Sequence, residues 1–511
     1  MVERDADRLY QAMLARDPRF DGRFFVGVRT TGVYCRSICP APTPKRGNCR
    51  FFASAAAAQS AGFRPCKRCR PETAPASPAW SGTEATVRRA LRLIADGALD
   101  DATVGALAIR LGVGERHLRR LFDTHLGASP AAVARTQRLH LAKQLLERTD
   151  LPMADVALAA GFGSVRRFND QVRQVYGAPP GSLRRDHGRR TGGVAPVELR
   201  LGCRPPFDWP ALAGFLSARA IPGLETCTQG YRRSIRLGPA CGVLDVSPGP
   251  GGALTARLHL DGAAPLLAAV AGIRSLFDID ADTAGITAHL ATDRRLAPLV
   301  ARAPGLRVPG AWDAFELAVR AVLGQQVTVA GARTLLGRLV ATHGDPLPGA
   351  DGQGAWRLFP EAGRLAEADL TAIGLTRARA ATVRGLAAAA ASGDLCLDPA
   401  DDPDEAMRRL RALPGIGAWT AGYIAMRALR HPDAFPSADA ALLKAARRLG
   451  IAETARGLDD AAEAWRPWRA YAAIHLWHSL SDSEPRHAVF PAAPVDRNRG
   501  LADRRPAAGD A

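Results

Sequence analysis

The chain has no long apolar run, no apolar leader and few cysteines for its length. No stretch of its 511 residues approaches about 18 consecutive apolar residues without a charge, which argues against a membrane-spanning helix. The first residues alternate acidic and basic side chains and lack the apolar core of a secretory signal. Nine cysteines do not make a disulfide framework in a chain of this size, so we expect a cytoplasmic protein with a metal site or a reactive thiol.

Acidic residues are in deficit. The chain has 50 acidic and 68 basic side chains, which leaves a net charge of +18. Such an excess favours a polyanionic partner, and the lack of a membrane segment favours nucleic acid over a membrane surface. An arginine-rich surface without any partner fits the same number, so charge alone does not separate the two interpretations.

The segment 84–185 contains an internal helical repeat. In each copy, apolar residues at helical spacing lead to a glycine, Gly112 or Gly161, and then to a second amphipathic helix. A helix, a glycine turn and a second helix form the helix-turn-helix unit. A single copy would be better explained as a helical hairpin with a solvated basic face. The presence of two copies favours DNA binding. The side chains suited to phosphates and base edges are Arg116, Arg119, Arg120, Arg166 and Arg167.

This segment resembles the AraC-type DNA-binding domain. The resemblance covers residues 84–186 and is most specific in the second copy, DVALAAGFGSVRRFNDQVRQVYGAPPGSLRR. It implies paired recognition helices that read two adjacent major-groove segments of double-stranded DNA.

Four cysteines form two short-spaced pairs near the N-terminus. Cys35 and Cys39 stand four residues apart, and Cys66 and Cys69 stand three apart. Two such pairs suit one tetrahedral Zn²⁺, each supplying two thiolates from a tight turn. A closed four-sulfur site is normally structural, so a small zinc knuckle is the plainest interpretation of the spacing.

The flanks of these pairs change that interpretation. The runs FFVGVRTTGVYCRSIC and GFRPCKRCRP resemble the N-terminal domain of the Ada methylphosphotriester-repair proteins, over about residues 5–72. The resemblance implies that Cys35 is both a zinc ligand and a nucleophile that removes a methyl group from a DNA phosphotriester, once per molecule. The Pro-Cys-His-Arg motif of the second Ada methyl-acceptor domain is absent, so repair of O6-alkylguanine is not expected. The basic neighbours expected to hold the DNA backbone are Arg36, Arg64, Lys67 and Arg68.

A glycine-rich corner, Leu413-Pro-Gly-Ile-Gly417, predicts a tight hairpin between two helices. We expect it to leave the amides of Gly415, Ile416 and Gly417 free to bind a DNA phosphate at the start of the following helix. An ordinary helix-turn-helix corner uses the same glycines, so the motif is suggestive only in context.

The context is a set of motifs over residues 200–484. PPFDWPALAGFLSARA, FELAVRAVLGQQV, LPGIGAWTAGYIAMRAL and PWRAYAAIHLW together resemble the helix-hairpin-helix DNA glycosylases, in particular the AlkA-like 3-methyladenine branch. The resemblance implies that Asp439 is the catalytic carboxylate, which stabilises an oxocarbenium-like sugar. It further implies that Trp419, Tyr423 and Trp477 stack against a flipped cationic base, and that Gln326 inserts into the vacated base stack.

Three positions depart from the family pattern. Bifunctional members place a lysine where this chain has Trp419, so we expect a monofunctional glycosylase without Schiff-base chemistry. Gln326 stands where an apolar wedge is expected, and Ala440 replaces a cleft aromatic. By themselves, Asp439 fits a helix N-cap and the tryptophans fit core packing, as we expect for Trp468.

These observations predict a multidomain fold, mainly α with α+β parts. The predicted function is DNA alkylation repair joined to transcription regulation, with one Zn²⁺, double-stranded DNA as partner, RNA polymerase as a second candidate partner, and a monomeric state. The alternatives are a transcription factor with a non-catalytic glycosylase-fold platform, and a glycosylase with a purely structural zinc domain. The predicted domains are a small zinc-binding domain over 1–76, an all-α double helix-turn-helix domain over 77–188, an α+β AlkA-like N-terminal subdomain over 194–302, an all-α helix-hairpin-helix glycosylase domain over 303–488, and a disordered tail over 489–511.

Overall fold

The fold is known from a computed structural model. It describes residues 6–16, 20–66, 68–69, 71, 84–95, 97–100, 102–149, 151–184, 196–262, 264–347, 356–397 and 403–481. Lys67 and the tail that we predicted to be disordered, 489–511, lie outside these residues. Within them, no helix is both long and apolar enough to cross a membrane.

The N-terminal region contains a small four-stranded sheet and two helices, one before the first strand and one between the third and fourth strands. Its strand order is β3-β1-β2-β4, with β1 antiparallel to both β2 and β3 and with β2 parallel to β4. This order brings the two cysteine pairs together, because one pair starts in β2 and the other follows β4. The elements are α1 (Ala6–Leu14), β1 (Phe25–Val28), β2 (Val33–Arg36), β3 (Cys49–Phe52), α2 (Ala55–Ser60) and β4 (Arg64–Pro65).

The predicted helical repeat is present. Gly112 and Gly161 end the first helix of each copy with φ of +70° and +80°, the left-handed conformation that glycine adopts without strain. Leu118 and Phe168, which belong to the second helices of the two copies, are fully buried. The elements are α3 (Glu84–Ala95), α4 (Val104–Arg110), α5 (Glu115–Leu126), α6 (Pro130–Arg148), α7 (Met153–Ala159), α8 (Val165–Tyr176) and α9 (Pro180–Leu183).

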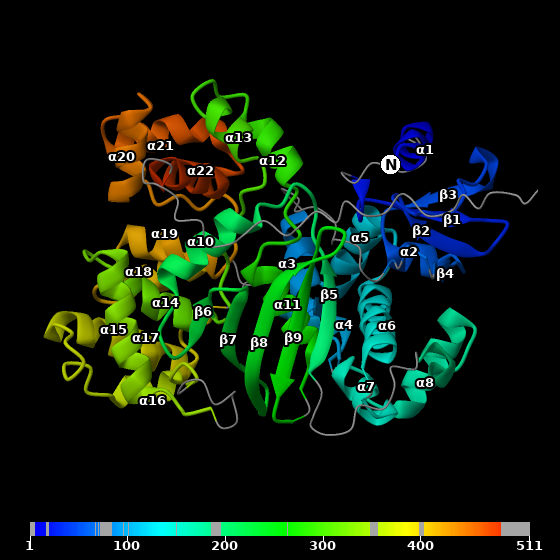
Figure 1. Ribbon diagram of the computed structural model, residues 1–511, viewed down its shortest axis with the longest axis horizontal. Coiled ribbons are helices and arrows are strands. Elements are labelled where there is room, and N and C mark those ends of the chain that lie inside the picture. Colours follow the sequence, from blue (N-terminus) through cyan, green and yellow to red (C-terminus); the bar gives the residue numbers. More distant parts are fainter. Residues whose placement is uncertain are drawn as a thin grey trace, which may run out of the picture.

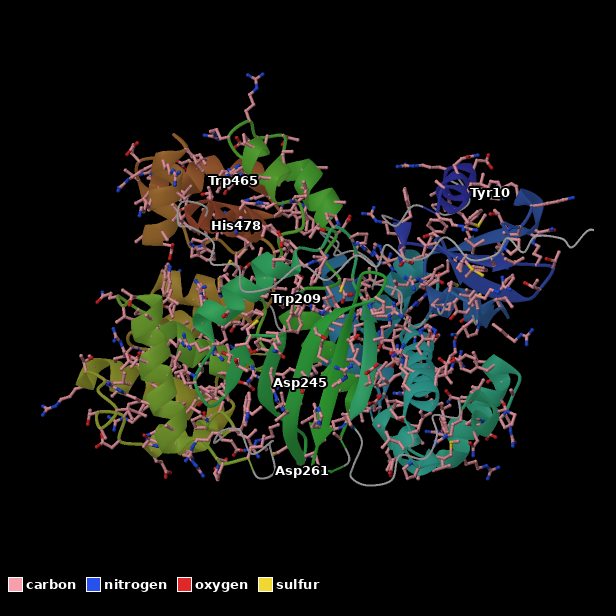
Figure 2. The ribbon with its side chains drawn as sticks, in the orientation of Figure 1. Tyr10, Trp209, Asp245, Asp261, Trp465 and His478 are labelled. Carbon is pink, nitrogen blue, oxygen red and sulfur yellow. The ribbon has the colours of Figure 1, made fainter. Side chains whose placement is uncertain are left out.

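A five-stranded antiparallel sheet of order β5-β9-β8-β7-β6 occupies the middle of the molecule (Figure 1). Trp209, at the start of α10, is buried next to this sheet, with its ring 5.6 Å from that of Phe277 (Figure 2). The elements are β5 (Val197–Gly202), α10 (Trp209–Arg219), β6 (Glu225–Cys227), β7 (Tyr231–Leu237), β8 (Ala240–Gly249), β9 (Ala253–Leu260), α11 (Leu266–Leu276), α12 (Thr283–Leu290) and α13 (Ala297–Arg302).

The remaining helices form two lobes on the left of Figure 1. One core lies among α14, α15, α17 and α19, and a second joins α12 and α13 to α20 and α22. The polypeptide passes from one lobe to the other between α19 and α20. The elements are α14 (Ala314–Leu323), α15 (Val329–His343), α16 (Ala362–Glu367), α17 (Arg377–Ser392), α18 (Pro403–Ala412), α19 (Ala418–Arg427), α20 (Ala440–Arg448), α21 (Ala455–Ala462) and α22 (Arg469–Ser481).

Neighbouring regions share hydrophobic cores across the predicted domain boundaries. Phe25 and Tyr34 of the first sheet belong to one core with Leu93 of α3. Likewise, Leu145 of α6 belongs to one core with Leu199 of β5. The structure thus packs residues 6–184, the regulator-like half, directly against the half that follows it, and the predicted domain boundaries stay a prediction.

A buried ion cluster joins the five-stranded sheet to the helical lobes. Glu316 of α14 is 3% exposed, and its carboxylate lies 2.7 Å from Arg233 Nη2 of β7 and 2.6 Å from Arg320 Nη2. Arg320 also lies 2.7 Å from Glu225 of β6. Burial raises the pKa of the Glu316 carboxyl, but the two arginines more than offset this and hold that pKa below its usual value. Glu316 is therefore charged and contributes stability at neutral pH.

We expect Glu316→Gln to lower the free energy of unfolding by about 3–5 kcal/mol at pH 7, because it leaves two buried arginines without their shared anion. Since the folded-state pKa is depressed, this difference should be present above about pH 4.3 and shrink as the pH falls below it. Urea unfolding of both proteins across this range measures it.

The matched control is Asp245→Asn. Asp245 of β8 pairs with Arg232 at 3.1 Å, and both side chains are about one-third exposed (Figure 2). Its loss should cost less than about 1 kcal/mol. Equal losses for the two variants would contradict the role of the buried cluster.

Candidate functional site

The four predicted zinc ligands lie together. Cys35 is in β2, Cys39 follows in the next turn, and Cys66 and Cys69 follow β4. All four sulfur atoms lie within 4.8 Å of one another, and those of Cys39 and Cys66 are 4.0 Å apart. Tetrahedral Zn²⁺ with Zn–S bonds of about 2.3 Å requires sulfur separations of about 3.8 Å. The donor set therefore fits one zinc ion.

The four sulfurs differ in exposure and hydrogen bonding. Cys66 and Cys69 are buried, and their sulfurs accept hydrogen bonds from the amides of Arg68 (3.4 Å) and Arg36 (3.3 Å). Cys35 is half-buried, and no amide within the described chain donates to its sulfur. Sulfurs of neighbouring cysteines raise the pKa of the Cys35 thiol, so the four thiolates are stable together only around a cation. Cys35 is thus more accessible than Cys66 and Cys69, and its sulfur accepts fewer amide hydrogen bonds than theirs do.

The basic residues near this cluster fall into two groups. Arg36 is engaged inside the protein: its guanidinium pairs in a bidentate manner with the buried Asp21 and donates to the Cys69 carbonyl at 3.2 Å. These contacts argue against a role for Arg36 in holding the DNA backbone, which stays a prediction. Arg64 and Arg68 are exposed. Arg64, in β4, lies next to the C-terminal end of α8.

The five arginines of the helical repeat that are predicted to contact DNA all lie on the exposed faces of α5 and α8. Arg119 pairs with Glu115 at 2.6 Å, one turn earlier, and Arg120 contacts the His117 ring at 3.1 Å. Their exposure agrees with a recognition face, and their contacts with DNA stay a prediction. The remaining three are Arg116, Arg166 and Arg167.

Asp439 is the N-cap of α20 and also the centre of a polar cluster. Its Oδ1 accepts hydrogen bonds from the Leu442 amide (2.8 Å) and from Trp477 Nε1 (2.9 Å). Its Oδ2 accepts a third from Trp419 Nε1 (3.0 Å). The two interpretations of Asp439 are thus compatible, because three donors from three helices fix one carboxylate.

The three predicted aromatic residues form one wall of a cleft around this carboxylate. Trp419 and Tyr423 of α19 stack with ring centroids 5.5 Å apart and planes 15° apart. The Trp477 ring meets Tyr423 edge-on at 6.3 Å. The cleft has a volume of about 1130 Å³ and is bounded by residues of α10, α14, α15, α19, α20 and α22.

Two arginines in this cleft were not identified from the sequence. Arg427 is buried, donates to the Tyr423 hydroxyl at 2.7 Å and reaches the carbonyls of 309–310. Arg219 lies over the Phe215 ring at 3.8 Å. Burial raises the pKa of the Tyr423 phenol, but Arg427 and Arg219 outweigh it and lower that pKa. The sequence signal for Arg219 was the FLSAR segment, which resembles the family pattern although no role was assigned to its arginine.

The predicted hairpin connects α18 to α19. Gly415 has a φ of +84°, and a Cβ there would lie 2.1 Å from Thr382 Oγ1, so only glycine fits. The Ile416 amide donates to the Leu413 carbonyl at 3.1 Å, so the expectation that this amide is free is wrong. In the part of the chain that is described, the amides of Gly415 and Gly417 donate a hydrogen bond to no backbone carbonyl.

Gln326 lies in the turn between α14 and α15, next to the hairpin. It is exposed and has a φ of +54°, an uncommon conformation for a residue other than glycine. Its neighbour Gln325 secures the turn by donating to the Gly415 carbonyl (3.0 Å) and to Thr420 Oγ1 (2.9 Å). Insertion of Gln326 into a base stack stays a prediction.

Three family models match the chain. They are the metal binding domain of Ada over residues 8–72, a helix-turn-helix domain over residues 107–186, and the AlkA N-terminal domain over residues 198–313. The first match and the sulfur geometry together confirm the predicted structural zinc site. The three matches also confirm the predicted multidomain fold class.

Curated relatives match the whole chain or one half of it. DNA-3-methyladenine glycosylase 2 of Escherichia coli is 37% identical over 289 residues, 55% of this chain and 96% of that protein. The bifunctional transcriptional activator/DNA repair enzyme Ada of E. coli is 38% identical over 171 residues, 34% of this chain and 47% of that protein. The probable bifunctional transcriptional activator/DNA repair enzyme AlkA of Mycobacterium tuberculosis is 45% identical over 482 residues, 93% of this chain and 97% of that protein. With both halves matched in one relative, the chain belongs to the family of bifunctional AlkA-type transcriptional activators and DNA repair enzymes.

Proposed function

We propose that this protein has three activities on double-stranded DNA. It releases alkylated purines of the 3-methyladenine type by hydrolysis at Asp439, and it accepts a methyl group from DNA methylphosphotriesters once, at Cys35. It regulates transcription as a monomer through α5 and α8, with RNA polymerase as second partner. The observation that carries the base-release activity is the Asp439 carboxylate, held between two indole N–H groups in an aromatic cleft.

The chemistry of base release follows from this arrangement. An alkylated purine is cationic and is a good leaving group, so the protein has mainly to stabilise positive charge that develops on the sugar. The Asp439 carboxylate supplies the opposing negative charge without reorganising, because its hydrogen bonds are already made. The Trp419 and Tyr423 stack and the Trp477 edge provide electron-rich surfaces for the flipped base. No lysine is among the described residues that line the cleft, which supports a monofunctional reaction.

The hairpin and the Gln326 turn are placed to hold the DNA around this cleft. The amides of Gly415 and Gly417 precede α19, where the helix dipole adds positive potential for a phosphate. Gln325 ties the Gln326 turn to the same hairpin. A phosphate bound there would therefore lie next to the side chain that replaces the flipped base.

We expect Asp439→Asn to lower the single-turnover rate of base release by about 100-fold or more, because it removes the charge that the transition state requires. Asparagine is also a good N-cap, so α20 should still form. The assay measures free methylated purines released from dimethyl-sulfate-treated DNA, and binding to the same DNA should change little.

The outcomes are distinguishable. Release by Asp439→Asn at the wild-type rate would remove this residue from the mechanism, and no release by the wild type would favour the non-catalytic platform. Neither protein should be trapped on DNA by borohydride, since no lysine forms a Schiff base.

Methyl transfer uses Cys35, one of the two half-buried cysteines of the cluster. Bound zinc would keep its sulfur ligands deprotonated at neutral pH. The Cys35 sulfur attacks the methyl carbon, the bond from that carbon to the phosphotriester oxygen breaks, and the phosphodiester leaves with the electron pair. The product is a thioether with no easy return, so each molecule acts once. Arg64 and Arg68 are exposed to hold the DNA backbone during the attack.

We expect one zinc ion per chain and methylation of Cys35 alone after incubation with methylated DNA. Metal analysis and mass spectrometry of tryptic peptides measure both. Cys39 is the internal control, because it is half-buried like Cys35. A methyl group on Cys39, Cys66 or Cys69 would contradict the assignment.

Methylation of Cys35 also changes the local charge. Four thiolates around Zn²⁺ carry a net charge of −2, and one thioether leaves −1. At an effective dielectric of about 20 and a distance of about 5 Å, one unit charge against a phosphate is worth roughly 3 kcal/mol. The zinc region is held on the helix-turn-helix region, because the Tyr34 hydroxyl, one residue before Cys35, lies 2.9 Å from His140 Nε2 of α6. Both regions would therefore contact the same stretch of DNA.

We expect methylation of Cys35 to strengthen operator binding about tenfold, because salt screening leaves roughly half of that energy. Operator affinity is measured at fixed salt before and after methylation of the full chain. Cys35→Ser is the control and should show no gain. Equal affinities, or a gain that persists in Cys35→Ser, would contradict the charge switch.

A further inference from the structure

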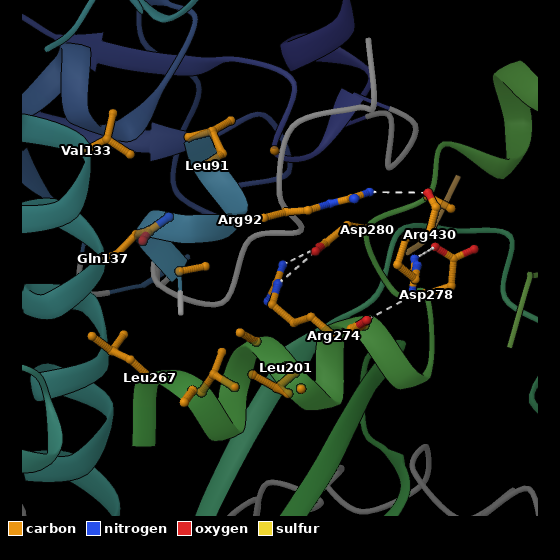
Figure 3. A pocket seen from close by; sticks show the side chains of 18 of the residues that line it. Leu91, Arg92, Val133, Gln137, Leu201, Leu267, Arg274, Asp278, Asp280 and Arg430 are labelled. Carbon is orange, nitrogen blue, oxygen red and sulfur yellow. Dashed lines mark hydrogen bonds and ion pairs between the residues drawn. The ribbon is translucent and has the colours of Figure 1, made fainter. Parts of the chain in front are cut away.

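A cavity of about 630 Å³ lies where the regulator-like half meets the glycosylase half. Residues of α3 and α6 line it from one side, and residues of α11 and of the segment after α19 line it from the other (Figure 3). Arg92 of α3 extends across this junction toward residue 430.

Arg92 contacts the C-terminal end of a cleft helix. Its Nη1 donates to the Leu429 carbonyl at 3.2 Å and its Nη2 to the Arg430 carbonyl at 3.4 Å. These carbonyls directly follow α19, which ends at Arg427. A positive charge close to a helix C-terminus is favourable. A residue of the regulator-like half thus binds the turn that directly follows the helix carrying Trp419.

The same junction reaches the second cleft helix. The Arg430 guanidinium pairs with Asp278, which is 2% exposed. Asp278 Oδ2 also accepts hydrogen bonds from the Tyr471 hydroxyl of α22 at 2.8 Å and from the Val308 amide at 3.3 Å. Since Trp477 is on α22, the helices behind both sides of the aromatic cleft are tied together at Asp278.

The backbone at this junction needs external support. Arg430 has a φ of +58° and Asp278 has a φ of +50°, both in the left-handed region that residues other than glycine rarely adopt. Such conformations persist where surrounding contacts over-determine them. Arg92 supplies two of those contacts, from a different half of the chain.

We propose that Arg92 is a positioning residue of the glycosylase. By holding the end of α19, it keeps Trp419 and Tyr423 in place against Trp477 and Asp439. The inference rests on the proposed base release at Asp439, since a shift of the helix matters only if the cleft performs chemistry. This role of Arg92 would make the regulator-like half a structural part of the glycosylase and not only a neighbouring region.

We expect Arg92→Ala in the full chain to lower the single-turnover rate constant of base release about five- to tenfold at saturating protein, because small displacements of reacting groups are costly. The dissociation constant for a duplex with a stable abasic analogue should stay within twofold. Arg92→Lys keeps a cation near the carbonyls and should recover part of the rate.

The rate constant separates positioning from stability. A variant that is partly unfolded needs more protein to saturate the DNA but then reaches the wild-type rate constant, whereas a displaced helix changes the rate constant itself. The matched control is Arg148→Ala. Arg148 of α6 also bridges the two halves, pairing with Glu198 at 3.4 Å, but it does so at β5, the sheet edge opposite β6. Its rate constant should equal that of the wild type.

An unchanged rate constant in Arg92→Ala would overturn the proposal, and so would an equal fall in Arg148→Ala, which would assign the effect to docking in general. A wild-type protein that releases no base would instead refute the proposed function.

Discussion

Helix α19 is fixed at both ends, and the arrangement of the cleft depends on this. Its first turn follows the hairpin, where Gly415 is the only residue type that fits against Thr382. Its last turn is buried, with Arg427 bonded to the carbonyls of 309–310. Between these anchors it presents Trp419 and Tyr423 on one face. A helix that is fixed at its ends holds side chains on its face more accurately than a loop does, which is what a preorganised site requires.

Asp439 combines a structural role with the catalytic role proposed for it. As an N-cap it must lie at the start of α20, next to the helix N-terminus, where a negative charge is favourable. The indole hydrogen bonds from Trp419 and Trp477 draw α19 and α22 toward the same point. The three contacts that keep the carboxylate in place are also contacts that hold three helices together, so the geometry of the site and the packing of the fold are not separable.

The sequence predicts short-range features well. Cysteine spacing, the glycine stops and the hairpin motif each depend on a few adjacent residues, and the structure has all of them. Features that depend on folded geometry were not predictable. The Arg36–Asp21 pair joins residues fifteen positions apart through the sheet order, and the Ile416 hydrogen bond depends on the backbone dihedrals of one turn. The shared cores were missed for a related reason, because an apolar helix face does not indicate which partner will cover it.

The net charge of +18 is a further case in which composition and structure carry different information. Several arginines are scaffold rather than surface: Arg233, Arg307 and Arg427 are buried. Arg307 donates to backbone carbonyls of four residues, which joins the loop before α10 to the turn after α11. Guanidinium groups suit this task, since five donors in a rigid plane satisfy several carbonyls at once. Attraction to a polyanion therefore depends on the exposed subset, which includes the arginines on α5, on α8 and beside the cysteine cluster, and not on the total.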